Sequence, residues 1–444
     1  MLAFLTSEVT VGPIGGPLVA HLAFVVLLVG SRAFFSWLTL QNRRYGARTL
    51  RREREWVDER LGMDDPEQVI AYQRAKTTLS EVSSWTTLVV VLVVLYSGAF
   101  ALAVEWLTAF DLGTVLAGTL FFVGALVGLQ LLSVPFEYYD TFVIEERFEF
   151  NNQTPTLFVR DLLVQLVISS VIVAVLAAGV IWFVVTLTWW PLAALALFAG
   201  FSLTMLVVYP RVIAPLFNDF DPVEAGPLRE SVEAVFDRAG FACEEIYVMD
   251  ASRRSGHSNA YFTGFGRSKR VVLFDTLVDQ LEFEQIEAIL AHELAHWKCG
   301  HIWKGFAASQ LRIGILLAVL WVLVGAEWLY AMFATPETAY VGLALGALWL
   351  GPLSAVSQPL ENRLSLAHER EADTVATAVM GDGEPLVEAL CRLADENLMN
   401  PFPHQLYATF HYTHPPIPDR IKYLEQLGDE VDVDSLPVNV GETA

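Results

Sequence analysis

Long apolar stretches constrain this chain more than any other feature. A helix that crosses the hydrocarbon core of a bilayer needs about 20 mostly apolar residues, because its backbone polar groups can be satisfied only within the helix. Seven stretches meet this requirement, so we expect membrane-spanning helices at residues 17–38, 86–107, 114–136, 162–188, 191–212, 308–333 and 339–360. The first stretch is long and no Lys or Arg precedes it, which favours a retained anchor over a cleaved signal peptide. We therefore predict an all-α membrane protein.

Arginine side chains are concentrated between the first two predicted spans. The segment QNRRYGARTLRREREWVDERLG contains seven of them: Arg43, Arg44, Arg48, Arg51, Arg52, Arg54 and Arg60. Cytoplasmic loops carry an excess of basic residues, so this segment is predicted to be cytoplasmic and the N-terminus to lie outside. Counting spans from there places both long polar segments of the chain, 213–307 and 361–444, on the cytoplasmic side. Residues 1–212 then form an N-terminal membrane domain with five spans, and residues 308–360 contain spans six and seven.

The overall charge excludes one class of partner. The chain has 28 basic and 50 acidic residues, for a formal net charge of −22. A phosphate backbone requires a basic footprint, so we expect no nucleic-acid partner. The three cysteines lie far apart and in no C-x-x-C pair, so a disulfide framework is not indicated.

The first polar segment, 213–307, combines strand and helix patterns. The runs EEIYVMD, NAYFTGFG and RVVLFDTL are short, rich in β-branched and aromatic residues, and broken by Gly and Ser, so they predict a small β-sheet. From Glu284 the apolar residues follow helical spacing instead.

That predicted helix carries the motif His292-Glu293-x-x-His296. Residues four apart share one helix face, so both imidazoles can reach one zinc ion, while Glu293 lies where it can take a proton from water. By chance such a motif is expected in only about 0.01 of chains with this composition. The alternative is a helix with two solvated or core histidines.

A zinc protease needs a third protein ligand and an open fourth position. The stretch ENRLSLAHEREADTVATAVMG offers Glu369 as that ligand, and Asp373, one helical turn later, could hold a ligand histidine through its second ring nitrogen. Each acidic residue could instead belong to a solvated helix face. The predicted topology returns this segment to the membrane side of His292, so we expect one Zn²⁺ per chain.

Six motifs in order carry a family resemblance. They are YYDTFVIEERFEFNN, YPRVIAPLFNDFDPVEAGPLRE, SGHSNAYFTGFGRSKRVVLFDTL, AHELAHWKCGHIWK, EREADTVA and THPPIPDRI. Together they resemble the CAAX prenyl protease 1 family of integral-membrane zinc metallopeptidases, over about residues 135–425. Leu366 and Arg370 depart from the family's pattern, which commonly has an arginine and an aromatic residue there.

The resemblance implies a fold and a catalytic centre. Seven transmembrane helices would form a barrel around a large water-filled chamber, with a zincin-like metalloprotease domain that contains the small sheet at the cytoplasmic end. This domain would have two parts, one with the HExxH helix and one with the third ligand. The implied zinc ligands are His292, His296 and Glu369, and the implied catalytic base is Glu293.

The resemblance assigns three further residues. His414 would donate a hydrogen bond to the oxyanion of the tetrahedral intermediate, although its own sequence context suits a turn histidine. Asn259 and Ala260 match the substrate-binding strand edge, which an extended peptide could join; the alternative is an inner strand of the sheet. Arg420 is predicted to form a salt bridge, and His301, about 140° around the helix from His296, to be structural. His368 could be an alternative ligand, but its side chain would point away from the Glu369 face.

Three functions remain open from the sequence. The first is a zinc endopeptidase that cleaves near the C-terminus of prenylated CAAX-type or other membrane-associated proteins, with a peptide or protein substrate held at the bilayer. The second is a broader protease for the quality control of membrane proteins. The third is a non-enzymatic seven-span protein with structural zinc, which is disfavoured because a structural site needs four ligands and no span shows a convincing ionisable pair. The acidic tail after about residue 427 is predicted to be dispensable.

Overall fold

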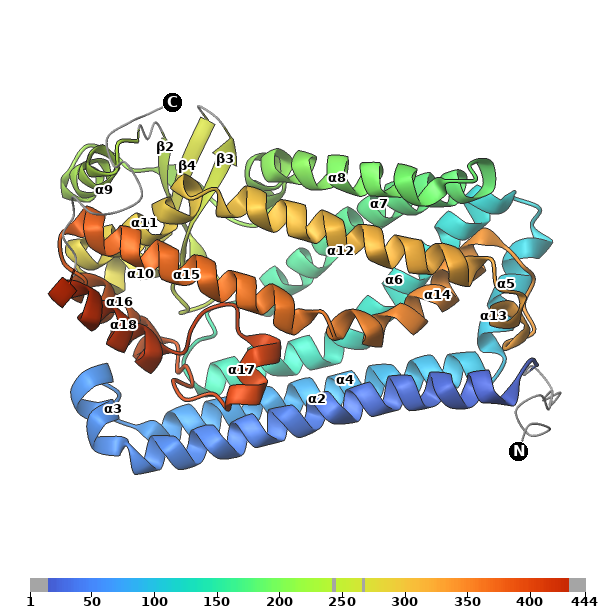
Figure 1. Ribbon diagram of the computed structural model, residues 1–444, viewed down its shortest axis with the longest axis horizontal. Helices are drawn as coiled ribbons and strands as arrows, with labels where there is room; N and C mark the ends of the chain where they lie inside the picture. Colours follow the sequence, from blue (N-terminus) through green and yellow to red (C-terminus); the bar gives the residue numbers. More distant parts are fainter. Residues whose placement is uncertain (1–14, 242–244, 266–267, 431–444) are drawn as a thin grey trace.

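Long helices that run along the long axis of the molecule dominate this computed structural model (Figure 1). The structure describes residues 15–241, 245–265 and 268–430. Among these described residues, six helical segments are long and apolar enough to cross a membrane. They are α2 (Leu18–Arg52), α4 (Pro66–Tyr96), α6 (Thr114–Tyr139) with the π-helix η1 (Asp140–Glu145), α7 (Pro155–Thr186), α8 (Trp190–Val208) with η2 (Tyr209–Ile213) and η3 (Ala214–Leu216), and α12 (His301–Val324). α14 (Ala339–Ala355) and α15 (Gln358–Met380), which meet at a 50° bend, make a seventh if they are counted as one span. The prediction of a mostly helical, multi-span membrane protein is confirmed.

The second predicted span, 86–107, is placed wrongly. The membrane-length helix there is α4, which ends at Tyr96, and a separate short helix, α5 (Ala99–Ala109), follows. Gly98 between them has φ +87°, a left-handed conformation that ends an α-helix. Hydropathy does not detect this break, because the residues on both sides of it are apolar.

The spans do carry ionisable pairs, contrary to the sequence interpretation. The Arg32 guanidinium of α2 lies 2.6 Å from the Glu81 carboxylate of α4. Arg312 of α12 pairs with Glu361 of α15 at 2.9 Å. In both cases the partners come from different helices, so the pairing could not be read from any single apolar stretch.

A four-stranded sheet lies at one end of the helices, beside α11 (Figure 1). Its strands are β1 (Phe220–Pro222), β2 (Glu245–Met249), β3 (Ala260–Phe265) and β4 (Ser268–Phe274), in the order β1-β2-β4-β3. β2 and β4 are parallel, whereas β1 pairs with β2, and β3 with β4, in antiparallel fashion. The predicted small sheet is therefore present, and among the described strands β3 forms one edge.

Further helices lie toward the same end of the molecule as this sheet (Figure 1). They are α3 (Arg54–Leu61), α9 (Pro227–Arg238), η4 (Ala251–Arg253), α10 (Asp275–Gln280), α11 (Phe283–Lys298), α16 (Glu384–Glu396), α17 (Gln405–His411) and α18 (Ile417–Glu430). α11 begins with a capping box, in which Glu282 and Gln285 satisfy each other's free backbone N–H groups. Its buried residues join the core of this end, together with residues of α9, α16 and the sheet. α18 extends to Glu430, beyond the point where the sequence predicted a loose tail.

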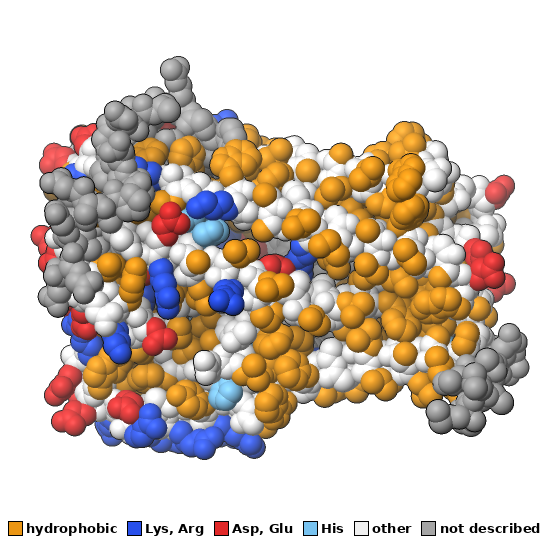
Figure 2. Space-filling view, in the orientation of Figure 1, with side chains coloured by type: hydrophobic (Ala, Val, Ile, Leu, Met, Phe, Trp, Pro, Cys, Tyr) orange, Lys and Arg blue, Asp and Glu red, His pale blue; other side chains and the backbone are white. Residues whose placement is uncertain are grey.

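The two ends of the molecule differ in the side chains on their surfaces. Hydrophobic side chains cover the part built from α8, α12 and α14, whereas charged side chains gather at the end that holds α3, α9 and α16 (Figure 2). A second buried core lies in the membrane part and is rich in aromatic residues, including Phe24, Trp190, Phe333 and Tyr340. The short helix α13 (Glu327–Ala331) packs at the far end, against α14.

Candidate active site

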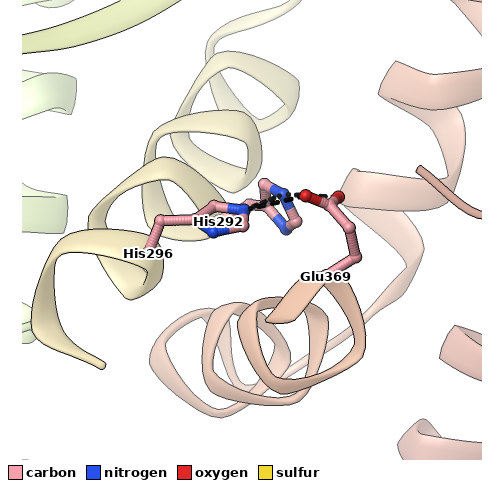
Figure 3. A group of neighbouring side chains, drawn as sticks. All are labelled: His292, His296 and Glu369. Carbon is pink, nitrogen blue, oxygen red and sulfur yellow. Dashed lines mark hydrogen bonds and ion pairs between the residues drawn. The ribbon is translucent and has the colours of Figure 1, made fainter. Parts of the chain in front are cut away.

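Two histidines of α11 turn their side chains to one point, where α15 packs against this helix (Figure 3). His292 is buried, with 5% of its surface exposed, and His296 is partly buried. Their Nε2 atoms lie 3.1 Å apart. This closeness follows from the spacing of four residues, which stacks the two side chains on one helix face.

Glu369 of α15 completes the group from the opposite side. Its Oε2 lies 3.4 Å from Nε2 of His292, and its Oε1 lies 3.2 Å from Nε2 of His296 (Figure 3). The carboxylate is almost fully buried, with 3% of the side chain exposed. A buried carboxylate that faces two imidazole nitrogens is a set of donors that can hold a metal ion.

The spacing of these donors fits zinc. Ligands about 2.0–2.1 Å from Zn²⁺ in tetrahedral geometry lie about 3.3 Å from one another. The three separations in the structure, 3.1, 3.2 and 3.4 Å, bracket that value. Two imidazoles and one carboxylate are also a typical ligand set of a catalytic zinc site.

A buried carboxylate and a guanidinium orient His292. Asp373, with none of its surface exposed, places Oδ1 2.9 Å from Nδ1 of His292. Arg420 of α18 forms a 2.6 Å ion pair with the same carboxylate. If Nδ1–H donates to Asp373, the Nε2 lone pair is left for the metal. Burial and Arg420 disfavour the charged imidazole, but contacts with Asp373 and Glu369 outweigh them and raise the pKa of His292 above its ordinary value.

His296 has a support of its own, which the sequence interpretation missed. Nδ1 of His296 lies 2.9 Å from Nδ1 of His301, whose Nε2 lies 3.1 Å from Glu371. The ring of His368 stacks on His301, with centroids 4.1 Å apart, so His368 faces this support and not the metal. The sequence interpretation placed His301 on one continuous helix, whereas α11 ends before Gly300, which has φ +68°, and α12 begins after it.

Glu293 and His414 lie beside these three candidate ligands. Both line a cleft of about 520 Å³ that also reaches His292. The His414 side chain is 63% exposed, and its Nδ1 lies 2.6 Å from Oε2 of Glu369. A carboxylate, an exposed imidazole and a group of donors that can hold a metal ion therefore border the same cleft.

One wall of this cleft is the start of β3. Asn259 and Ala260 both line it. The carbonyl of Asn259 accepts a hydrogen bond from the N–H of Phe274, so in an antiparallel ladder the backbone groups of the next residue, Ala260, point away from β4 to the outer side. The Ala260 N–H is in contact with the Asn259 side-chain oxygen, at 2.8 Å.

The opposite wall of the cleft is apolar. It is formed by α16 and the residues that follow it, including Leu386, Leu390, Leu393 and Met399. A second cavity, of about 660 Å³, approaches the ligands from the other side, between α12 and α15, and is lined by His296 and His301. The face over α12 and α15 is visibly hollowed (Figure 2).

Comparisons with known proteins agree with this geometry. Residues 50–219 match a family model described as CAAX prenyl protease N-terminal, five membrane helices, and residues 222–427 match that of Peptidase family M48. The CAAX prenyl protease 1 homolog of Oryza sativa subsp. japonica is 35% identical over 310 residues, covering 69% of this chain and 72% of that protein. The CAAX prenyl protease 1 of Saccharomyces cerevisiae is 32% identical over 348 residues, covering 72% of this chain and 75% of that protein.

The fold is similar to that of a solved relative. The crystal structure of S. mikatae Ste24p superposes with a TM-score of 0.83 at 29% sequence identity, over 92% of this chain and 99% of that one. The human CAAX prenyl protease 1 homolog is 30% identical over 345 residues, covering 67% of this chain and 71% of that protein.

Proposed function

Because this chain is a membrane metallopeptidase that belongs to the CAAX prenyl protease 1 family, we propose that it is a zinc endopeptidase acting near the C-termini of prenylated CAAX-type or other membrane-associated proteins. The observation that carries the proposal is the group of His292, His296 and Glu369 at zinc-like spacing. This group borders a cleft that also holds a carboxylate and an open strand edge. We assign these three residues as the zinc ligands.

The reaction needs a base, and Glu293 is placed to be one. A bound zinc ion would supply Lewis-acid polarisation of the scissile carbonyl and would lower the pKa of the attacking water. Glu293 follows a ligand histidine directly and lines the cleft, so its carboxylate can take the proton from that water and deliver it to the leaving amine. His414 is exposed toward the cleft and would donate a hydrogen bond to the oxyanion. Asp373 would fix the tautomer of His292 from behind.

The substrate backbone would be held at Ala260. Its outward N–H and C=O can pair with an extended peptide, which adds a strand to the edge of the sheet. Asn259 would also act at this edge. Its side-chain oxygen contacts the Ala260 N–H, which is the group that the peptide would pair with. The apolar wall formed by α16 suits apolar side chains on that peptide.

The membrane setting favours a lipid-modified substrate. A prenyl group must be kept out of water, and a protease built on six or seven spans can receive such a group from the bilayer. The relatives' printed names, CAAX prenyl protease 1, point to the same class of substrate.

The site is proposed to face the cytoplasm. The C-terminal turns of α2 carry Arg51 and Arg52 at the end of the molecule that also holds α11 and the sheet (Figure 1). Basic residues next to spans are enriched on the cytoplasmic side, so this end is assigned to the cytoplasm and the start of α2 to the outside.

Paired measurements on purified wild type and Glu293→Gln test the proposal. Both proteins should hold about one zinc ion per chain, and only the wild type should cleave a farnesylated peptide that ends in a CAAX sequence. A chelator should abolish the cleavage, and added Zn²⁺ should restore it.

Substrate choice is decided by a matched peptide without the prenyl group. A much higher kcat/KM for the farnesylated peptide supports CAAX processing, and equal cleavage of both peptides would favour a broad quality-control protease. Zinc in both proteins without cleavage of any peptide would contradict the enzymatic proposal and return the site to a structural role.

A further inference from the structure

A histidine outside the metal site joins the two walls of the cleft. The imidazole of His257, two residues before the strand edge, reaches across to Asn397, the residue that ends α16. Nδ1 of His257 lies 2.7 Å from Oδ1 of Asn397. One wall of the cleft begins at Asn259, and the other is the face of α16 that carries Leu393. The His257–Asn397 contact therefore joins the segment that precedes one wall to the end of the helix that forms the other.

The direction of this hydrogen bond is determined by its surroundings. Nδ2 of Asn397 donates to the carbonyl of Leu393 at 2.8 Å, which turns Oδ1 of the amide toward His257. An amide oxygen only accepts, so Nδ1 of His257 must carry the proton. The bond to Leu393 also fixes the Asn397 side chain to the last turn of α16.

The other ring nitrogen faces acceptors as well. Nε2 of His257 lies 3.3 Å from Oε2 of Glu145, at the end of η1. It also lies 3.3 Å from the hydroxyl of Tyr72, which itself donates to Glu145 at 2.9 Å. Both ring nitrogens therefore act as donors, which describes an imidazolium ion. Phe150 stacks on the ring at a centroid distance of 4.2 Å and limits its rotation.

The surroundings of the His257 ring have opposing effects on its pKa. Burial disfavours the imidazolium, the contacts with Glu145 and Asn397 favour it, and the ammonium of Lys76 disfavours it. Lys76 lies 2.7 Å from Glu145, so it shares this carboxylate with the histidine, and it also lies 2.6 Å from Asp140. The net effect raises the pKa of His257 above its ordinary value.

The backbone beside His257 is held just as firmly. Its carbonyl accepts from the Thr276 hydroxyl at 3.0 Å, the N–H of Gly256 donates to the Phe150 carbonyl at 3.0 Å, and the Ser258 hydroxyl donates to Gln280. The segment before the strand edge thus has few ways to move, and the bond to Asn397 connects it to the end of α16.

We infer that His257, held between Glu145 and Asn397, is a positioning residue that sets the distance between the substrate edge at Ala260 and the wall of α16. Glu145 belongs to a membrane-spanning segment, so the same network ties the cleft to the membrane helices. This inference rests on the proposed binding of peptides at the strand edge. Its expected signature is weaker peptide binding, not loss of the chemical step.

Three variants test the inference. His257→Gln removes the charge, Asn397→Leu removes the acceptor at similar size, and Glu145→Gln removes the carboxylate's charge. In each variant, the KM for an extended peptide should rise about tenfold, which corresponds to the loss of one charge-assisted hydrogen bond. The kcat and the zinc content should stay close to those of the wild type. Glu146→Gln is the matched control, because this neighbouring carboxylate bonds Asn151 outside the network and should leave KM unchanged.

The pH dependence of KM separates positioning from general stability. The imidazolium is present below the raised pKa and is lost as the pH rises through it, so wild-type KM should increase toward alkaline pH. His257→Gln should remove this dependence, and Glu145→Gln should move it to lower pH. Unchanged KM values, or a fall in zinc content and kcat that accounts for the loss, would overturn the inference.

Failure of the proposed function can be distinguished from failure of this inference about His257. The dissociation constant of a labelled peptide, measured in the Glu293→Gln background, reports on binding without cleavage. If wild type cleaves and the variants bind as tightly as their parent, only the positioning role is wrong. If wild type cleaves nothing, the proposed function is wrong, and the same binding constants still decide the role of His257.

Discussion

Removing the positive charge behind His292 should destabilise the protein strongly. Arg420 is 9% exposed at its side chain and Asp373 is fully buried. Arg420 makes three contacts with that carboxylate, of 3.2, 2.9 and 2.6 Å. Arg420→Met keeps the length of the side chain but leaves a buried carboxylate without its cation, which costs about 3–5 kcal/mol. Because Nδ1 of His292 remains 2.9 Å from Asp373, we expect a value near 3 kcal/mol.

A double variant separates stability from metal binding. In Asp373→Leu with Arg420→Met both charges are gone, so most of the lost stability should return. Zinc affinity should instead fall in the double variant, because only there has His292 lost its carboxylate partner, and loss of such a partner typically lowers affinity about 10–100-fold.

The assay is denaturant unfolding of the metal-free protein in detergent, since bound zinc would itself add stability. Zinc affinity is measured separately by competition with a chelator. Arg392→Met is the control, because this arginine, 52% exposed, pairs with Glu396 at the surface and should cost less than about 1 kcal/mol. The reasoning fails if Arg420→Met costs no more than the control, or if the double variant is as unstable as the single one.

Three further predictions concern packing, reactivity and the end of the chain. Gly342→Ala should cost about 1–3 kcal/mol in unfolding experiments, because its new methyl group would lie 2.1 Å from the Tyr330 hydroxyl, whereas Gly128→Ala, with open space, should be tolerated. Burial raises the pKa of the Cys391 thiol to about 11. Only about 0.1% is then thiolate at pH 8, so mass spectrometry should find Cys391 unalkylated in the folded protein and alkylated in denaturant. Truncation after residue 430 should preserve peptidase activity, whereas truncation before Leu424, which is fully buried, should lower the unfolding midpoint. An unchanged unfolding midpoint without Leu424, or no activity without residues 431–444, would contradict the last prediction.

The sequence predicts elements well where one residue type determines the outcome. Apolar runs of about 20 residues predict most of the membrane spans, and short runs rich in β-branched and aromatic residues predict strands of the sheet. The spacing in His292-Glu293-x-x-His296 brings two imidazoles together because a helix turn is a local property. The ends of the helices are harder to predict. α2 continues to Arg52, well beyond its apolar part, because polar residues can extend a helix that the membrane has already fixed.

What the sequence does not show are contacts that depend on two distant segments. Arg32 and Glu81 lie 49 residues apart and meet only because α2 and α4 pack side by side. His301 was assigned a structural role because the break at Gly300 was not expected, and its contact with His296 follows from that break. A conformational preference of one glycine thus decided whether this histidine supports the metal site.

The site as a whole depends on how α15 leaves the membrane. Within a few residues this helix presents Glu369 to both ligand histidines, Glu371 to His301 and Asp373 to His292. The 50° bend after α14 lets α15 run against α11 instead of continuing in the direction of the span. One helix therefore supplies the third donor and both supporting carboxylates, so the proposed metal site depends on the packing of α15 against α11. A fragment that contains α11 without α15 would keep its two histidines but should bind zinc weakly, because it lacks a donor and both supports.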